Sequence, residues 1–268
     1  MYRGMTVHRE GGAPKFFGDP LPSGNRDELI TMEDMPRFPA GQTLLIDADD
    51  TLWENNVYFE RAIAAFIGFL NHRTYTPEKV RQTLNEVERE TILEHGYGLT
   101  SFTRSLVQCY ERLSPGPVSE EQRERVRGFA KTIADHEIEL LPGVQETLAQ
   151  LGSRHRLILM TKGNHAEQAD KLSRSGLAPF FNAVEIVAEK DAAVYREVMA
   201  RHSLAASTSW MIGNSPKSDI NPALAAGLNA VHLYHKDTWV LEHAELAEPG
   251  RGQHLIELDG FAKLADIF

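Results

Sequence analysis

The chain has 268 residues, with 28 Lys and Arg against 38 Asp and Glu, giving a formal net charge of −10. This acidic balance argues against a nucleic acid or an anionic membrane as the main partner, but a metal ion could still offset it locally for a small anionic substrate. Cys109 is the only cysteine, which excludes an intrachain disulfide and favours a reducing compartment. The N-terminus lacks the apolar segment of a signal peptide, so we expect a cytoplasmic protein.

The N-terminal part divides into an arm, a strand and a helical block. Residues 1–37 are rich in Gly, Pro and charge, which predicts an extended surface arm or partial disorder. An apolar strand follows at about 42–47. Residues 54–140 then show only helical patterns, with helices expected at about 57–72, from Thr76-Pro77, after Thr100 and from Ser119. The longest apolar run, 62–70, lies in this block and is too short to span a bilayer.

From Leu141 onward, apolar strands alternate with helices. The predicted strands lie at about 157–160, 183–187, 210–212, 230–233 and 255–258, with helices ending near 151, 176, 202 and 227 and a short terminal helix. Alternation of this kind is typical of a parallel sheet covered on both faces. We therefore predict an α/β fold in which residues 38–53 and 141–268 form a doubly wound core and residues 54–140 form an inserted helical cap.

Polar residues follow most of the predicted strands, and the carboxyl ends of parallel strands share one edge of a sheet. The residues expected to converge there are Asp47, Asp49, Thr161, Lys190, Asn214 and Asp219. Each one alone is more easily explained as a turn or cap residue, whereas the ordered set is hard to explain by chance. Asp47 and Asp49 are close enough to repel unless a cation lies between them or one holds a proton.

This set resembles the motifs of the haloacid dehalogenase (HAD) superfamily, whose members are mostly phosphatases. Residues 47–52, Asp-Ala-Asp-Asp-Thr-Leu, are similar to its first motif, DxDx[TV][LV]. Thr161, Lys190 and residues 213–219 are similar to its second, third and fourth motifs. The resemblance covers about residues 40–260, with the helical block as the cap. Two positions depart from the common pattern, because Asn214 stands where Asp is usual and Asp50 where Gly is common.

The resemblance implies a Mg²⁺-dependent phosphatase that acts on a small phosphorylated metabolite, such as a nucleotide or sugar phosphate. Asp47 would attack phosphorus and form an aspartyl-phosphate, and Asp49 would act as general acid and then general base. Thr161 would hold phosphoryl oxygens, and Lys190 would offset their charge. Asp47, Asp49 through its backbone carbonyl, and Asp219 would hold Mg²⁺, with Asn214 nearby.

Three further residues are candidates for substrate binding. Lys162 adjoins the expected phosphate site, although a solvated side chain is the main alternative. Asn55 lies at the expected hinge of the cap. Tyr97 lies in a glycine-rich break between cap helices, which in the HAD family often points at the substrate, although a plain loop fits equally well. His232 and His235 alternate along a strand end, and their loose spacing does not favour zinc.

Three alternative functions use the same fold. A 2-haloacid dehalogenase needs the first Asp but has no leaving-group oxygen to protonate, so Asp49 favours phosphoryl transfer, whereas Asn214 resembles the dehalogenase form of the fourth motif. A phosphomutase would use the same residues as a phosphatase. A non-catalytic binding protein is less consistent with the retention of both Asp47 and Asp49. The sequence does not indicate the substrate, the oligomeric state or the role of residues 1–37.

Overall fold

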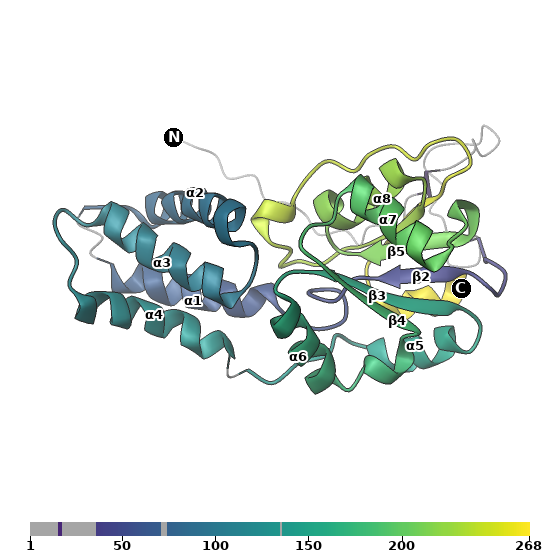
Figure 1. Cartoon of the computed structure of the whole chain (residues 1–268), viewed down its shortest axis with the longest axis horizontal. Helices are drawn as coiled ribbons and strands as arrows, with labels where there is room; N and C mark the ends of the chain where they lie inside the picture. Colours follow the sequence, from purple (N-terminus) through teal and green to yellow (C-terminus); the bar gives the residue numbers. More distant parts are fainter. Residues whose placement is uncertain (1–15, 18–35, 71–73, 135) are drawn as a thin grey trace, which may run out of the picture.

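The computed structural model describes residues 16–17, 36–70, 74–134 and 136–268. Most of the predicted arm lies outside these ranges, apart from the two-residue strand β1 (Phe16–Phe17), which pairs antiparallel with β7. An α/β core and a group of four helices lie side by side along the long axis of the molecule (Figure 1). Among the described residues, no helix has both the length and the apolar character needed to cross a bilayer.

The core is built on a seven-stranded sheet with the order β1-β7-β6-β5-β2-β3-β4. Its parallel strands are β2 (Thr43–Ile46), β3 (Arg156–Lys162), β4 (Ala183–Val187), β5 (Ser209–Gly213), β6 (Asn229–Leu233) and β7 (Leu255–Leu258). The first predicted strand, β2, lies between β3 and β5 and pairs in parallel with both. The predicted doubly wound parallel sheet is therefore confirmed, and the carboxyl end of β2 is central at its edge.

Helices cover both faces of this sheet because successive strand residues point to opposite sides. Leu44 and Ile46 pack into one apolar cluster and Leu45 packs into another. The core helices are α5 (Val144–Gly152), α6 (His165–Ser175), α7 (Ala192–His202), α8 (Asn221–Ala226) and α9 (Leu264–Ile267). A turn of π-helix, Pro216–Ile220, leads directly into α8.

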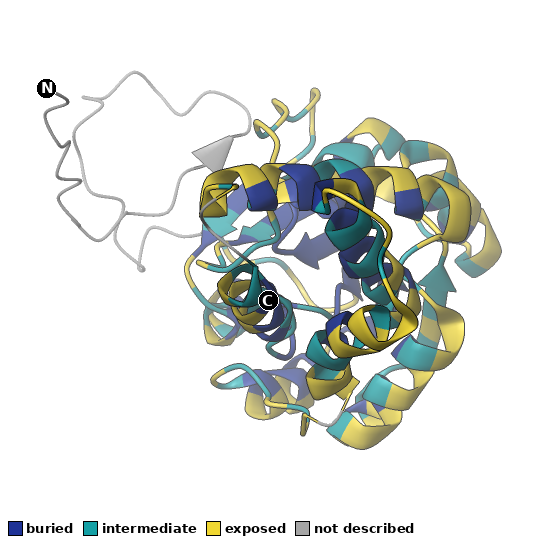
Figure 2. Ribbon diagram, turned by 90° about the vertical axis from the view of Figure 1, so that its left-hand side faces the viewer, coloured by how far each residue is buried: buried dark blue, intermediate teal, exposed yellow. Residues whose placement is uncertain are grey.

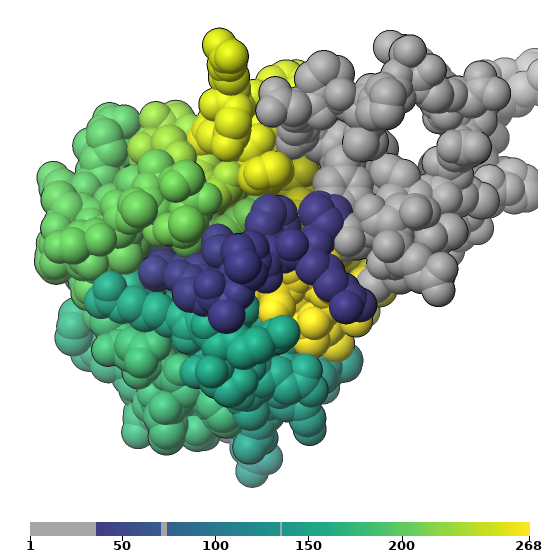
Figure 3. Space-filling view, turned by 90° about the vertical axis from the view of Figure 1, so that its right-hand side faces the viewer, coloured from purple at the N-terminus to yellow at the C-terminus, as the bar shows by residue number. Residues whose placement is uncertain are grey.

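The end of the core opposite the cap is closed by the segment that enters β2. Figure 3 shows this segment running between the α5–β3 region and the C-terminal residues. The backbone N–H of Phe38 donates to the carbonyl of Ile267 at 2.7 Å, and its ring lies 4.4 Å from that of Trp210. These contacts fix the start of β2, and the opposite end of the strand is left to carry polar residues.

Four helices make up residues 56–134: α1 (Asn56–Phe69), α2 (Pro77–His95), α3 (Leu99–Leu113) and α4 (Glu120–Ala134). Thr76 caps α2 by accepting from the N–H of Lys79. Ser119 and Gln122 exchange the two hydrogen bonds of the predicted capping box at the start of α4. The first helix ends at Phe69, earlier than expected, and the third begins earlier, at Leu99.

The four helices bury an apolar core of their own, separate from that of the sheet. It includes Phe66, Leu84, Val87 and Leu106, each with no exposed surface. Seen from the cap side, the buried residues gather on the inward faces of the helices and the exposed ones on the outside (Figure 2). One charged residue, Glu88, is also buried here, with only 5% of its surface exposed.

The position of Glu88 predicts a pH-dependent stability. Burial raises the pKa of Glu88 from 4.5 to about 7. The folded protein therefore retains the proton more strongly than the unfolded chain, so the neutral carboxyl contributes stability below pH 4.5 that is lost as pH rises through about 7. Glu88→Gln should remove this loss and stabilise the protein by about 3 kcal/mol at about pH 8, with little effect at about pH 4.

Denaturant unfolding of the wild type and the variant across this pH range measures the difference. Glu94→Gln is the matched control, because Glu94 lies on the same helix with 71% of its side chain exposed, so it should not alter the pH dependence. Equal pH dependence in the wild type and Glu88→Gln would contradict the buried, raised-pKa state of Glu88.

Candidate active site

The carboxyl edge of the sheet gathers the residues predicted from the strand ends. Asp47 directly follows β2, and its N–H donates to the carbonyl of Ile212 on β5 at 2.9 Å, so the strand pairing continues to the carboxylate. Thr161 lies near the end of β3, and Asn214 follows β5. Together with Asp49, Lys190 and Asp219, these residues line one cavity.

Lys190 forms the centre of the site. Its Nζ lies 2.5 Å from Oδ1 of Asp47 and 2.7 Å from Oδ1 of Asp219. Only 1% of the Lys190 side chain and 1% of the Asp219 side chain are exposed. Removing charges from water in this way has a large desolvation free energy, which only close pairing of opposite charges can offset. Two carboxylates and one ammonium leave this buried group with an excess negative charge.

Burial, and after it the excess negative charge, shifts the pKa values of the buried carboxylates. Burial, followed by the charge of Asp219, raises the pKa of Asp47 to about 7 despite its pairing with Lys190. Burial also raises the pKa of Asp50 to about 8, and the charges of Asp49 and Asp47 add to this effect. An added cation would lower the pKa of both Asp47 and Asp50, because a nearby positive charge favours the ionised carboxylate.

Oxygen atoms suited to a hard cation lie next to Asp47. Thr51 Oγ1 donates to Asp47 Oδ2 at 3.0 Å and lies 3.4 Å from Oδ1 of Asn214. The amide nitrogen of Asn214 is occupied, because it donates to Thr238 Oγ1 at 3.0 Å. The amide oxygen of Asn214 and Oδ2 of Asp47 therefore both lie beside the hydroxyl of Thr51. Carboxylate and amide oxygens are the ligands that Mg²⁺ accepts, so this set fits the ion that the fold family implies.

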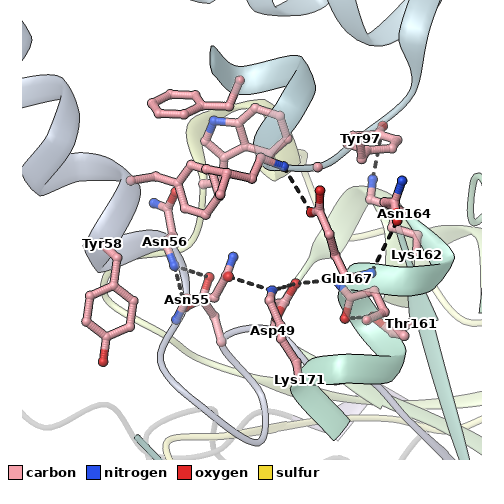
Figure 4. Close-up of a pocket in the computed structure, with 18 of the residues that line it drawn as sticks. Asp49, Asn55, Asn56, Tyr58, Tyr97, Thr161, Lys162, Asn164, Glu167 and Lys171 are labelled. Carbon is pink, nitrogen blue, oxygen red and sulfur yellow. Dashed lines mark hydrogen bonds and ion pairs between the residues drawn. The ribbon is translucent and has the colours of Figure 1, made fainter. Parts of the chain in front are cut away.

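Asp49 lines the same cavity and is held by three donors; Figure 4 shows Lys171 beside it. Its carboxylate accepts from Trp53 Nε1 at 2.7 Å, from Gln168 Nε2 at 2.9 Å and from Lys171 Nζ at 2.8 Å. Burial acts to raise the pKa of Asp49. Lys171, Gln168 and Trp53 stabilise its negative charge more strongly, so the pKa lies below its ordinary value. Asp49 is therefore ionised at neutral pH and lacks the proton that a general acid must donate.

Gln168 connects the two halves of the site. Its Oε1 accepts from Thr161 Oγ1 at 3.3 Å while its Nε2 donates to Asp49. Asn55, predicted to lie at the hinge of the cap, accepts from Lys171 Nζ at 2.8 Å. Gln168 and Lys171 are not among the site residues predicted from the sequence. Their spacing of three residues on the helix that follows Thr161 places them on one face, and this spacing was the available signal.

The main alternative to substrate binding by Lys162 was a solvated side chain, but only 13% of this side chain is exposed. Its Nζ lies 2.7 Å from Glu242 Oε1, 2.8 Å from Ser218 Oγ and 3.2 Å from the hydroxyl of Tyr97. Burial acts to lower the pKa of Lys162. The opposing charges, chiefly that of Glu242, outweigh this effect and raise the pKa. Lys162 and Tyr97 both line the cavity, and Tyr97 brings the loop between α2 and α3 onto the core.

Asp50 adopts a left-handed backbone conformation with φ 59°, which explains why Gly is common at this position and why Asp, which tolerates it, can replace it. Its carboxylate accepts from the N–H groups of Asn55 and Asn56 at 2.9 and 3.0 Å, which anchors the start of α1. A second group of possible metal ligands lies nearby. One carboxylate oxygen each of Asp50 and Glu54 and one ring nitrogen of His235 lie within 4.8 Å of one another. The sequence did not favour zinc at either His232 or His235, and Nδ1 of His232 lies 3.6 Å from Oε2 of Glu257.

The fold agrees with solved structures of HAD-like proteins. A haloacid dehalogenase-like family hydrolase from Xanthomonas campestris is 28% identical, with a TM-score of 0.70 over 85% of this chain and 94% of that one. An L-2-haloacid dehalogenase from Xanthobacter autotrophicus is 14% identical, with a TM-score of 0.56 over 84% and 97% of the two chains. A predicted phosphoglycolate phosphatase from Haemophilus somnus is 18% identical, with a TM-score of 0.56 over 85% and 97%.

The last two neighbours show the fold alone and carry different chemistries, so they do not separate the phosphatase from the dehalogenase. Comparison with curated proteins gives no significant match. The sequence model of the haloacid dehalogenase-like hydrolases matches residues 44–233, which contain Asp47, Thr161, Lys190 and Asp219. The motifs, the parallel sheet and this match agree, and the chain belongs to the haloacid dehalogenase-like hydrolase family.

Proposed function

We propose that the protein is a Mg²⁺-dependent phosphatase that hydrolyses a small phosphate monoester through an aspartyl-phosphate on Asp47. The observation that carries this proposal is the second carboxylate, Asp49, which lines the same cavity as Asp47 and Thr161. Displacement of a halide has no leaving oxygen to protonate, whereas hydrolysis of a phosphate ester needs a proton donor and acceptor beside the nucleophile. We assign both roles to Asp49.

The Mg²⁺ ion would be held by Asp47, the backbone carbonyl of Asp49, Asn214 and Asp219. When bound, it would supply positive charge that reduces the repulsion between an anionic phosphate and the carboxylates. The excess negative charge around Lys190 and the orientation of the Asn214 oxygen support this assignment. Zinc is less suited, because these donors are hard oxygens.

In the first step, an Asp47 oxygen would attack phosphorus as the bond to the leaving oxygen breaks. Lys190, in contact with Asp47, would offset the charge that gathers on the phosphoryl group, and the Thr161 hydroxyl would donate to a phosphoryl oxygen. The approaching phosphate is anionic, so it would raise the pKa of Asp49 and compete for Lys171. Asp49 would then take up a proton and pass it to the leaving oxygen.

In the second step, a water molecule would attack phosphorus of the aspartyl-phosphate and release phosphate. After giving its proton to the leaving group, Asp49 is ionised and would accept a proton from this water. The pairing of Asp49 with Lys171 at 2.8 Å supports that role, because it stabilises the ionised form. Gln168 would keep Asp49 and Thr161 in a fixed relation throughout both steps.

A 2-haloacid dehalogenase is the second candidate. Two observations favour it: Asn214 carries no charge at the fourth motif, and Lys171 holds Asp49 without a proton. In that reaction Asp47 would displace a halide from carbon, and the ester formed on Asp47 would be hydrolysed by water. The two functions differ in whether Asp49 and a metal are needed, and the experiments below separate them.

The net charge of −10 supports a small-molecule substrate over a nucleic acid or a membrane as the partner. The single cysteine, Cys109, supports a cytoplasmic location. Helices α1, α2 and α3 contribute residues to the cavity beside Asp47, which supports residues 54–140 as a cap that selects the substrate. A cap of this kind would also keep large phosphoproteins from Asp47.

Asp47→Asn should abolish turnover, because an amide is a poor nucleophile, and the loss should span several orders of magnitude. The rate of phosphate release from an aryl phosphate measures this loss of turnover. Trapping of a phosphorylated chain in the wild type identifies the intermediate. The exposed Asp266 supplies the control, since Asp266→Asn should retain activity. Near wild-type phosphate release by Asp47→Asn would overturn the mechanism.

Asp49→Asn should lose about 10²–10⁴-fold in kcat/KM on alkyl phosphates, whose leaving oxygens need a proton. Aryl phosphates with activated leaving groups need less protonation, so their loss in the first step should be smaller. A series of esters with graded leaving-group pKa measures the slope in both proteins. An equal loss on every ester would show that Asp49 does not protonate the leaving group.

Exhaustive EDTA treatment should abolish phosphate release, and added Mg²⁺ should restore it, because Lys190 alone leaves negative charge around Asp47. Activity is measured on the same aryl phosphate before chelation, after chelation and after Mg²⁺ is returned. Halide release from 2-haloacids is measured in parallel. Full phosphate release without metal would contradict the metal assignment, and halide release in EDTA would favour the dehalogenase.

A further inference from the structure

The cavity beside Asp47 continues from the edge of the sheet into the cap. It has a volume of about 380 Å³, which is sufficient for a small ligand. Its cap end is lined by Phe59 and Ile63 of α1, Ile92 of α2 and Phe102 of α3. Apolar side chains therefore surround whatever part of a substrate extends away from Asp47.

Glu88 of α2 also lines this apolar end. Its residue surface is 5% exposed, and its buried Oε2 has no hydrogen-bond partner among the residues that the structure describes. The guanidinium of Arg81, two turns earlier on α2, directs two nitrogens to Glu60 at 2.6 and 2.7 Å. The charges of Arg81 and Arg89 offset the burial of Glu88 only in part, because burial has the larger effect on its pKa. A buried carboxylate oxygen with no hydrogen-bond partner is destabilising, so its retention within a binding cavity points to a ligand.

The neighbouring polar groups determine what the ligand must offer. Ser101 donates its hydroxyl to the carbonyl of His95 at 3.5 Å, and Ser105 donates to the carbonyl of Ser101 at 3.1 Å. Both serines line the cavity and retain acceptor capacity on their oxygens. With the carboxylate of Glu88, this end of the cavity presents acceptors, so a complementary ligand group is a donor.

We propose that Glu88 binds a protonated amine on the leaving group, so that the substrate is the phosphate monoester of an apolar or aromatic amino alcohol. An ammonium group supplies both hydrogen-bond donors and the positive charge that a buried carboxylate requires. The apolar walls suit a ring or chain between the amine and the phosphate. The identity of the substrate as a phosphate ester rests on the proposed function, whereas the amine site rests on Glu88 and its surroundings.

The amine site can be tested without catalysis. Tyramine and 4-ethylphenol have similar shapes, and at about pH 8 tyramine carries a protonated amine while Glu88 is ionised. Calorimetry on the wild type should show tyramine binding at least about tenfold tighter than 4-ethylphenol. Glu88→Gln should remove most of this preference, and the exposed control Glu94→Gln should retain it. Equal binding of the two compounds by the wild type would overturn the proposal.

A kinetic comparison links the amine site to the reaction. 4-(2-Aminoethyl)phenyl phosphate should have a kcat/KM at least about tenfold higher than that of 4-ethylphenyl phosphate, and Glu88→Gln should bring the ratio close to one. Tyramine binding without hydrolysis of either ester would refute the phosphatase and leave the amine site standing. Hydrolysis of both esters with no preference, in wild type and variant alike, would refute the amine site and leave the phosphatase standing.

Discussion

The buried contact of Lys190 with Asp47 and Asp219 is the interaction on which the rest of the site depends. It joins three segments that are far apart in sequence: the end of β2, the loop after β4 and the π-helical turn after β5. Removing one member would leave an unpaired charge in the interior, which is more destabilising than replacing the whole group by apolar side chains. Such a group contributes little net stability, so fold stability alone does not account for its presence at the edge of the sheet.

Asn214 changes the electrostatics of this edge. With Asp at this position, the site would carry one more negative charge and bind a divalent ion more tightly. With Asn, a bound Mg²⁺ would leave Asp47, Asp219 and Lys190 with a net positive charge, which attracts an anionic substrate more strongly. The substitution would therefore weaken metal affinity and strengthen the field felt by a phosphate. Lys171, which also lines the cavity, adds to the positive field felt by a phosphate.

The sequence was sufficient to predict the sheet, because the parallel strands are short runs rich in apolar residues and polar residues follow most of them. It was also sufficient to place Asp47, Thr161, Lys190 and Asp219 together, since they follow strands whose ends share one edge. It did not reveal that Asp49 is paired with Lys171, because that contact depends on the angle at which α6 packs. The pairing of Lys162 with Glu242 was likewise hidden, since the two residues are 80 positions apart.

The network around Lys162 connects the cap to this edge. Tyr97, in the loop between α2 and α3, donates to Glu189 at 2.7 Å, and Glu189 directly precedes Lys190. Lys162 contacts Tyr97, and it also contacts Ser218, which directly precedes Asp219. A second contact lies nearby, where the N–H of Leu99 donates to Glu167 on α6 at 2.9 Å. The loop between α2 and α3 therefore rests on the neighbours of Lys190, which contacts Asp47, and of Asp219, which pairs with Lys190. Movement of the four helices would disturb those neighbours, so the position of these helices and the order of the edge that carries Asp47 are physically coupled.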